Sequence, residues 1–216
     1  NNGKKNFLIN NNFVPDGIIY DENLINTCKK NIIIMGVIDA LTHCIESTTT
    51  INKNYYLNFL SFNSVNYFIN KTPHTLFAKN KINDFNDINL LSFNGGLAQS
   101  NSGSGICHAL SHVAEEILNM GHSKCITFFI LPTLEYLKSK NKKDIKDFDS
   151  KLTKYIKELV KLVKKNENFS KLNNLILNEK KIDELITKSK NDLCWRLYKN
   201  NIDINLLKKC LLNAKN

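Results

Sequence analysis

The sequence lacks the signals that mark membrane and secreted proteins. No apolar run approaches the roughly 18–20 residues that a helix needs to cross a bilayer, and residues 1–12 lack the order of basic, apolar and small residues typical of a signal peptide. Neither G-x-G-x-x-G nor Gly-Gly-Gly-Ser occurs, so we expect no autonomous dinucleotide-binding loop. From the sequence we expect a cytoplasmic protein that does not bind membranes.

The chain also lacks a Cys-x-x-Cys pair, although it has six cysteines. A chain of 216 residues is long enough to bury a substantial core without a disulfide scaffold. We therefore expect reduced thiols. Cys44, Cys107 and Cys125 are interpreted as small core residues, with a role as soft metal ligands as the alternative.

Arginine is almost absent, which bears on the net charge of +10. Arg196 is the only arginine, although arginine is the preferred side chain for base edges and phosphates. Residues 1–137 carry 9 Lys and 10 acids, whereas residues 138–216 carry 21 Lys and Arg and 10 acids. Asparagine, lysine and isoleucine are abundant, which suggests an AT-rich genome. We interpret the excess as solvated helix faces and do not expect nucleic-acid binding.

Apolar periodicity predicts a mainly α fold from residue 32 onward. Apolar stripes predict helices within residues 32–46, 54–69, 87–99, 106–120, 148–163, 172–177, 182–186 and 206–212, and residues 125–134 form an apolar segment that contains Pro132. Before them, residues 7–9 and 18–20 are short β-prone runs beside turn signals. The Gly95-Gly96 pair inside a helical stretch predicts close helix packing or a kink.

Four of the five histidines lie in short helical segments with the spacing of metal ligands. Asp39 and His43 are four residues apart, so both side chains project from one face of a helix. His108 lies on a second predicted helix, and His122 follows at the start of a third segment. One carboxylate with several imidazoles suits Fe(II) or Zn(II) and is costly to bury without an ion. We predict that these four residues bind one metal ion.

Such an ion would suit hydride chemistry at a carbon–oxygen bond, because a Lewis acid polarises a carbonyl and stabilises an alkoxide. His112 lies one turn beyond His108, and we expect it to line the pocket as a proton relay. Glu46, Ser102 and Ser104 are further candidate pocket groups. The competing interpretation is that each histidine is an ordinary core residue and that the Asp-x-x-x-His pair is a surface ion pair.

The two histidine motifs resemble those of the iron-containing (group III) alcohol dehydrogenases. Residues 36–46 read Gly-x-x-Asp-Ala-Leu-x-His-x-x-Glu, and residues 105–112 read Gly-x-x-His-x-x-x-His. His122 follows at the spacing of that family. Residues 15–21, Pro-x-x-Ile-Ile-Tyr-Asp, look like the strand that leads from the family's nucleotide-binding domain into its helical domain. The resemblance is strongest over residues 36–46 and 95–132.

The resemblance implies a role for each residue of the two motifs. It implies that Asp39, His43, His108 and His122 bind a divalent metal, most often Fe²⁺ and sometimes Zn²⁺. It implies that His112 lies near the substrate and the nicotinamide. The expected activity is interconversion of an alcohol and an aldehyde or ketone with NAD or NADP, and the residues around the motifs are similar to branches that act on sugar-derived alcohols.

The resemblance also implies a domain organisation. Residues 1–31 would be the end of a nucleotide-binding domain and its linker, with a short β remnant. Residues 32–216 would be the helical metal-binding domain of the dehydroquinate synthase-like, iron alcohol dehydrogenase fold. NAD or NADP would then bind through a nucleotide-binding domain that these residues do not contain, so that domain is an expected partner. A homodimer is one alternative for the assembly.

Two other functions compete with this hypothesis. Dehydroquinate-synthase-like cyclases share the general architecture and the place of the metal, but their first ligand is typically Glu, whereas this chain has Asp39. The second alternative is a non-catalytic basic helical module, in which the histidines are structural and the C-terminal charge binds an anionic partner. Metal content and salt-sensitive binding would separate these alternatives.

Overall fold

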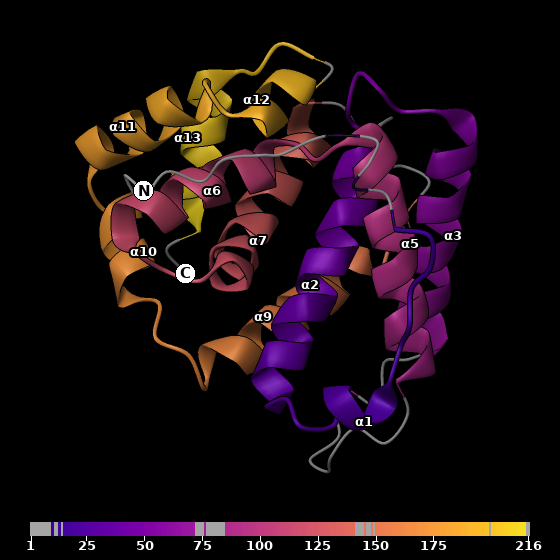
Figure 1. The fold of residues 1–216 in the computed structure, drawn as a ribbon. Helices are drawn as coiled ribbons and strands as arrows, with labels where there is room; N and C mark the ends of the chain where they lie inside the picture. The colour runs from indigo at the N-terminus through magenta and orange to yellow at the C-terminus, as the bar shows by residue number, and fades with distance from the viewer. Residues whose placement is uncertain are drawn as a thin grey trace.

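The fold is helical throughout the part of the chain that the computed structural model describes (Figure 1). That part comprises residues 10, 13, 15–71, 76, 85–140, 145, 148, 150–198 and 200–214. These residues form no β-strand, and their one isolated bridge joins Thr50 to Tyr198. Residues 18–20, predicted as β-prone, have no strand partner there, and residues 7–9 lie outside the described residues. The predicted mainly α class is confirmed.

Most helices occupy the segments in which the sequence predicted them, whereas the short helices at Glu22–Ile25 and Leu193–Leu197 were not predicted. In chain order they are α1 (Glu22–Ile25), α2 (Lys30–Ser47), α3 (Tyr55–Lys71), α5 (Asn86–Ser102), α6 (Ile106–Leu118), α7 (His122–Lys140), α9 (Leu152–Lys164), α10 (Ser170–Ile176), α11 (Glu179–Ser189), α12 (Leu193–Leu197) and α13 (Ile204–Asn213).

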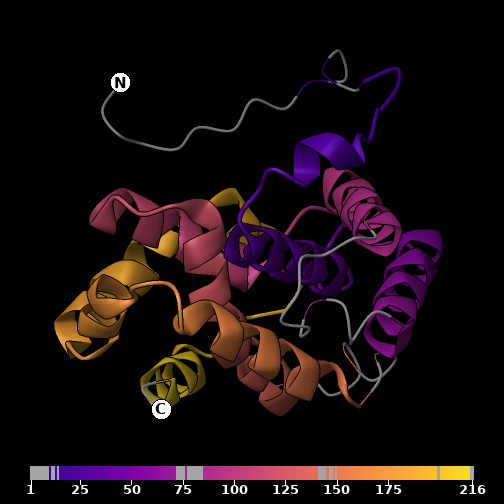
Figure 2. The same cartoon turned by 90° about the horizontal axis from the view of Figure 1, so that it is seen from below.

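Helix α2 runs through the middle of the molecule. Helices α3 and α5 lie on one side of it, and α6, α7 and the C-terminal helices lie on the other (Figures 1 and 2). Helix α2 contacts α3, α5, α6, α7 and α9. Its apolar side chains Ile38, Leu41 and Ile45 are fully buried. A helix with this many apolar residues is stable only where neighbouring helices cover it, so α2 lies at the centre. This central position places Asp39 and His43 of α2 next to α6 and α7, which carry the other histidines.

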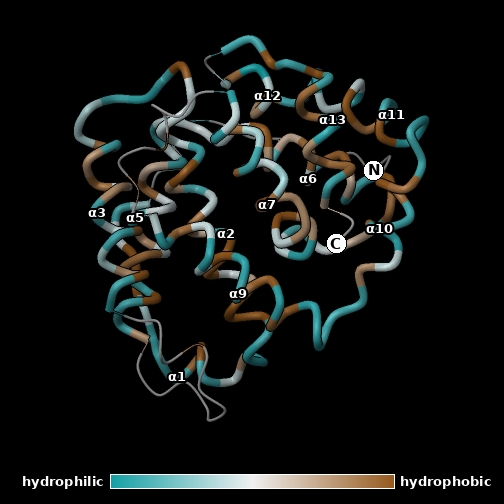
Figure 3. Tube along the Cα trace, turned by 180° about the vertical axis from the view of Figure 1, so that it is seen from behind, coloured by the Kyte–Doolittle hydropathy of each residue, from teal (hydrophilic) through white to brown (hydrophobic). Residues whose placement is uncertain are grey.

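Helix α9 has the clearest amphipathic pattern among the outer helices. Tyr155, Ile156, Leu159 and Val163 recur at helical spacing and are buried. Figure 3 shows hydrophobic and hydrophilic residues alternating along α9 and α3. The apolar face of α9 packs on α2 and α7, which closes the core below them.

Gly95 sets the distance between α5 and α2. A Cβ atom at this position would lie 2.8 Å from the backbone oxygen of Ala40, whereas one at Gly96 would have nothing within 4 Å. The predicted close packing at the Gly-Gly pair is therefore confirmed for Gly95, and Gly96 faces open space. Since Ala40 follows Asp39 directly, this contact fixes the backbone that carries the acidic residue of the histidine cluster.

Helix α2 begins at Lys30, and the predicted domain boundary after residue 31 stays a prediction. The origin of residues 1–31 in a nucleotide-binding domain stays a prediction. None of the helices in the described ranges combines the length and the apolar character that a bilayer crossing requires.

Candidate metal centre

Three of the four predicted ligands, Asp39, His43 and His108, place ligand atoms within 4.8 Å of one another, and His122 lies beside them between α2, α6 and α7. Asp39 and His43 lie on one face of α2, and the His43 Nε2 atom is 3.7 Å from Asp39 Oδ1. His108, in the first turn of α6, places its Nε2 atom 3.3 Å from the same oxygen. His122, the first residue of α7, places its Nε2 atom 3.8 Å from Asp39 Oδ2. Ligand atoms about 2.1 Å from one tetrahedral ion lie about 3.4 Å apart, so the spacings among Asp39, His43 and His108 fit a shared ion. His122 approaches the second Asp39 oxygen and also shares a group of possible ligands with His112 and Glu115.

The imidazole rings surround the Asp39 carboxylate as a compact group. The rings of His43 and His108 are stacked with centroids 4.6 Å apart, and those of His108 and His122 lie 5.5 Å apart. His108 is 2% exposed and His122 is 29% exposed, so the group is closed on the side of α6 and reachable on the side of α7. The cluster is therefore more exposed to solvent at α7 than at α6.

Glu46 orients His108 and caps α6 at the same time. Its carboxylate accepts hydrogen bonds from the backbone N–H groups of Gly105 at 2.9 Å and Cys107 at 2.6 Å. It also lies 2.7 Å from Nδ1 of His108. If Nδ1 carries the hydrogen, Nε2 is left with a lone pair that faces Asp39, which is the form that binds metal. The buried carboxylate is stabilised by the helix N-terminus.

His122 has a matching carboxylate partner, because its Nδ1 contacts Glu115 of α6. Two of the histidines are thus held by an acidic residue on Nδ1 while Nε2 faces Asp39. Asp39 Oδ1 and His108 Nε2 are buried and have no hydrogen-bond partner within the described structure, although they lie 3.3 Å apart. Two acceptors in this position need a cation between them. The residues present therefore fit a divalent metal ion.

The charges of the cluster shift the pKa values of its members. Burial raises the pKa of Asp39. The contact with His108 and the charges of the imidazoles outweigh the effect of burial and lower this pKa to about 2. Burial lowers the pKa of His108, but Asp39 and Glu46 raise it to about 9. His43 has a pKa of about 4, because burial and the charge of His108 lower it. In the metal-free protein a proton on His108 therefore occupies the place that a metal ion would take.

The buried thiols near the cluster are unsuited to metal binding. Burial raises the pKa of Cys44 to about 12, and burial together with Glu46 raises that of Cys107 well above its ordinary value. A metal ligand is the thiolate, which is disfavoured at both positions. Every cysteine, Cys125 included, is a free thiol, and Cys125 is buried. These features agree with the interpretation of the three residues as core residues.

His112 lies beside the ligands and has its own acidic partner. Its Nδ1 atom is 3.0 Å from Oδ2 of Asp192, and its ring stacks on that of His122 at 5.4 Å. The other oxygen of Asp192 accepts a hydrogen bond from the backbone N–H of Cys194 and so caps α12. Burial raises the pKa of Asp192, but the hydrogen bond with His112 lowers it below its ordinary value. His112 is thus held as an Asp–His pair next to the cluster, the arrangement of a proton relay.

Two acidic residues of the site were missed by sequence reasoning. Glu115 lies two turns beyond His108 on the same face of α6, and this spacing was a usable signal. Asp192 is 80 residues from His112, and no periodic pattern links them. Ser102 and Ser104, predicted as candidate pocket groups, do not cap α6: the N-cap is Gly105, and Glu46 supplies the cap from α2. Both hydroxyl groups are buried.

Comparison with known proteins gives a family match over most of the chain. Residues 33–205 match the family model described as Fe-containing alcohol dehydrogenase family, C-terminal. The chain is 27% identical over 132 residues to a "Probable alcohol dehydrogenase EutG" of Salmonella typhimurium, which covers 61% of this chain and 33% of that protein. The chain thus spans about a third of the length of the curated relatives that it matches.

Solved structures show the same fold. An alcohol dehydrogenase from Oenococcus oeni superposes with a TM-score of 0.75 at 12% identity, over 90% of this chain and 54% of that one. An iron-containing alcohol dehydrogenase from Corynebacterium glutamicum gives a TM-score of 0.72 at 15% identity, over 94% and 57%. At these identities the likeness concerns the fold alone, and the chain corresponds to about half of each structure.

Proposed function

This chain belongs to the iron-containing alcohol dehydrogenase family, and on that premise we propose that it is the metal-binding half of an oxidoreductase that interconverts an alcohol and an aldehyde or ketone. The observation that carries the proposal is the buried pair formed by Asp39 Oδ1 and His108 Nε2, which face each other at 3.3 Å without a hydrogen bond. This pair lies where two further imidazoles converge. Such a pair is costly unless a cation lies between its atoms.

In this proposal Asp39, His43, His108 and His122 hold a divalent ion, with Fe²⁺ preferred and Zn²⁺ as the alternative. Both metals accept one carboxylate and three imidazoles. When bound, the ion supplies Lewis acidity toward the oxygen of an alcohol or carbonyl substrate. Glu46 keeps His108 in the tautomer that presents Nε2, and Glu115 does the same for His122.

His112 is the residue that we propose moves the proton. Oxidation of an alcohol releases a proton from its hydroxyl group, and reduction of the carbonyl consumes one. The Asp192 carboxylate would stabilise His112 when it is protonated, and the hydrogen bond on Nδ1 directs Nε2 to the opposite side of the ring. His112 is 6% exposed, so the surrounding helices keep bulk water from most of the ring.

We propose that NAD or NADP provides the hydride acceptor and donor, bound by a nucleotide-binding domain outside these 216 residues. Family membership supports this part of the proposal, and so does the helical character of the chain. The substrate class that we propose is a small alcohol or aldehyde, with sugar-derived alcohols as the first group to assay. The cyclase alternative is assayed beside it by phosphate release.

Metal binding is tested first, on the chain as it is. Anaerobically purified protein should bind one equivalent of Fe²⁺ or Zn²⁺ by elemental analysis, and the ion should raise the unfolding temperature. Asp39→Asn should weaken binding at least about tenfold. Asp183→Asn, on the exposed face of α11, removes the same charge and should bind like the parent chain. A parent chain without a bound metal equivalent would refute the proposal.

Hydride transfer is tested on the product of the whole gene. Oxidation of NADH and NADPH is followed with a panel of aldehydes and ketones, and phosphate release is followed with phosphorylated sugar acids. The proposal expects hydride transfer that His112→Ala slows by at least about a hundredfold while metal content stays the same. Phosphate elimination without hydride transfer would assign the protein to the cyclases.

A further inference from the structure

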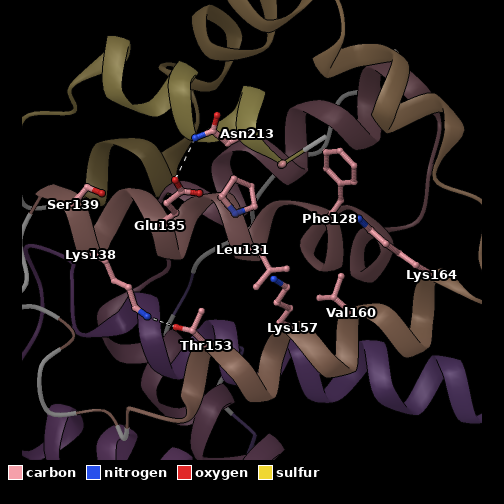
Figure 4. A pocket seen from close by; sticks show the side chains of 12 residues that line it. Phe128, Leu131, Glu135, Lys138, Ser139, Thr153, Lys157, Val160, Lys164 and Asn213 are labelled. Carbon is pink, nitrogen blue, oxygen red and sulfur yellow. Dashed lines mark hydrogen bonds between the residues drawn. The ribbon is translucent and has the colours of Figure 1, made fainter. Parts of the chain in front are cut away.

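A cavity of about 350 Å³ lies between α7 and α9 and beside the end of α13, and it shares no residue with the metal centre (Figure 4). Its floor is apolar and is formed by Phe128, Leu131 and Pro132 of α7 together with Val160 of α9. Phe128 and Val160 are buried, and Leu131 is half-buried. The floor of this solvent-accessible groove is therefore an apolar surface formed by side chains that are packed into the core.

The rim of this cavity is positively charged. Lys157 and Lys164, two turns apart on α9, reach toward Leu131 and Phe128 across the groove (Figure 4). Lys138, at the far end, contacts the hydroxyl group of Thr153. In the part of the chain that the structure describes, neither Lys157 nor Lys164 has a carboxylate within ion-pair distance.

Among the described residues, one acidic side chain lines the cavity. Glu135 accepts a hydrogen bond from Asn213 Nδ2 at 3.4 Å, which turns its carboxylate toward α13 (Figure 4). Among the described lining residues, three lysines and one acid give the cavity a positive potential, and the walls of the groove concentrate this potential. The three lysines belong to residues 138–216, which carry the whole positive excess of the chain. Part of the positive excess of the sequence therefore lies at this cavity, away from the metal centre.

We propose that this cavity binds a small anionic amphiphile, with the apolar body on the floor of the groove and a carboxylate or phosphate head against Lys157 and Lys164. The complementarity of an apolar floor and a cationic rim carries the proposal. A volume of about 350 Å³ is at the lower end for small-molecule sites. It suits a single chain of about ten carbon atoms better than a protein segment, and the site is independent of the proposed oxidoreductase function.

Decanoate is the probe, used below its micellar concentration with the whole chain and measured by calorimetry. Decanol tests the need for the charge, and acetate tests the need for the apolar chain. The parent protein should bind decanoate at least about tenfold more tightly than either compound. The double variant Lys157→Glu/Lys164→Glu should lose at least about tenfold in decanoate affinity.

The matched control is Lys180→Glu/Lys181→Glu, which makes the same charge change on the exposed first turn of α11. It should keep the parent affinity for decanoate. Equal losses in the two double variants, or equal binding of decanol and decanoate, would overturn the proposal. Binding to anionic vesicles without binding to free decanoate would also overturn it and would assign the surface to a membrane. Circular dichroism and metal content, expected to be unchanged, show that the variants fold.

Discussion

The chemistry of the metal centre depends most on His108, because its two ring nitrogens face two different carboxylates. Nδ1 faces Glu46 at 2.7 Å and Nε2 faces Asp39 at 3.3 Å. A proton and a metal ion therefore compete for the same nitrogen. Since the pKa of His108 is raised to about 9, metal affinity should increase with pH throughout the neutral range.

The stability of the metal-free protein should be greatest near pH 6.5, the ordinary pKa of the two histidines. The pKa of His108 is raised to about 9, so its contribution is complete below pH 6.5 and is lost as the pH rises toward 9. The pKa of His43 is lowered to about 4, so its contribution is lost as the pH falls from 6.5 toward 4. Urea unfolding in the presence of a chelator measures both limbs.

His108→Gln is the variant that isolates the alkaline limb. It should abolish the loss of stability above pH 6.5, which for a pKa shift of this size is about 3 kcal/mol. A smaller acid limb due to His43 should remain, because burial still lowers the pKa of His43 while the charge of His108 is gone. An alkaline limb that persists in His108→Gln would show that another group titrates there.

Replacing His112 by leucine should raise the pKa of Asp192. Burial raises this pKa, and the hydrogen bond with His112 is the main influence that opposes it. Loss of the imidazole leaves the effect of burial. A carbon-13 NMR titration of the aspartate carboxyl groups measures the change, with the exposed Asp183 as an internal control that should not move. An unchanged Asp192 would mean that the pair does not form in solution.

Among the elements, α6 depends on a cap that comes from another helix. Its N-cap residue, Gly105, has no side chain that could accept hydrogen bonds from the first backbone N–H groups of the helix. The carboxylate of Glu46 on α2 accepts these hydrogen bonds instead. Glu46→Gln keeps the shape but removes the charge. It should lower the free energy of unfolding of the metal-free protein by about 2–4 kcal/mol. Glu116→Gln on the exposed face of α6 should change it by less than about 0.5 kcal/mol.

The contact between α2 and α5 gives a prediction with a built-in control. Gly95→Ala should destabilise the protein by about 1–3 kcal/mol, because the new Cβ would meet the backbone of Ala40 at 2.8 Å. Gly96→Ala, on the open side of the same helix, should stabilise it by about 0.5–1 kcal/mol through helix propensity. Thermal unfolding compares the two, and a stabilising Gly95→Ala would contradict the close packing.

Local patterns predicted the helices well and long-range contacts poorly. The stripes in α2 and α9 locate both helices because burial repeats with the helical period. The spacing of Asp39 and His43 predicted a shared face for the same reason. The cap from Glu46 and the pair between His112 and Asp192 join residues about 60 and 80 positions apart, and chain packing decides such contacts. The sequence therefore indicated the four candidate ligands and Glu46, but it did not indicate Glu115 and Asp192, the acidic partners of His122 and His112.

At the scale of the whole molecule, charge is unevenly distributed. Residues 138–216 carry 21 basic residues against 10 acids, so the C-terminal helices repel one another. Raising NaCl from about 0.01 to 0.15 M shortens the screening length from about 30 to 8 Å. This should stabilise the chain by about 0.5–1 kcal/mol in urea unfolding. Lys180→Glu/Lys181→Glu should reduce this gain, and a parent protein destabilised by salt would contradict the prediction.

The link that Glu46 makes between two helices has a consequence for how an ion is captured. The first turn of α6 and the orientation of its histidine ring rest on one carboxylate, so the donor atoms are preorganised by folding itself. Under the proposed metal site, an incoming ion would replace a proton without moving the backbone, and the fixed donor atoms would favour ions of suitable radius and preferred geometry. Because Fe²⁺ and Zn²⁺ both suit this donor set, we expect the supply of each ion to decide which of them such a site would hold.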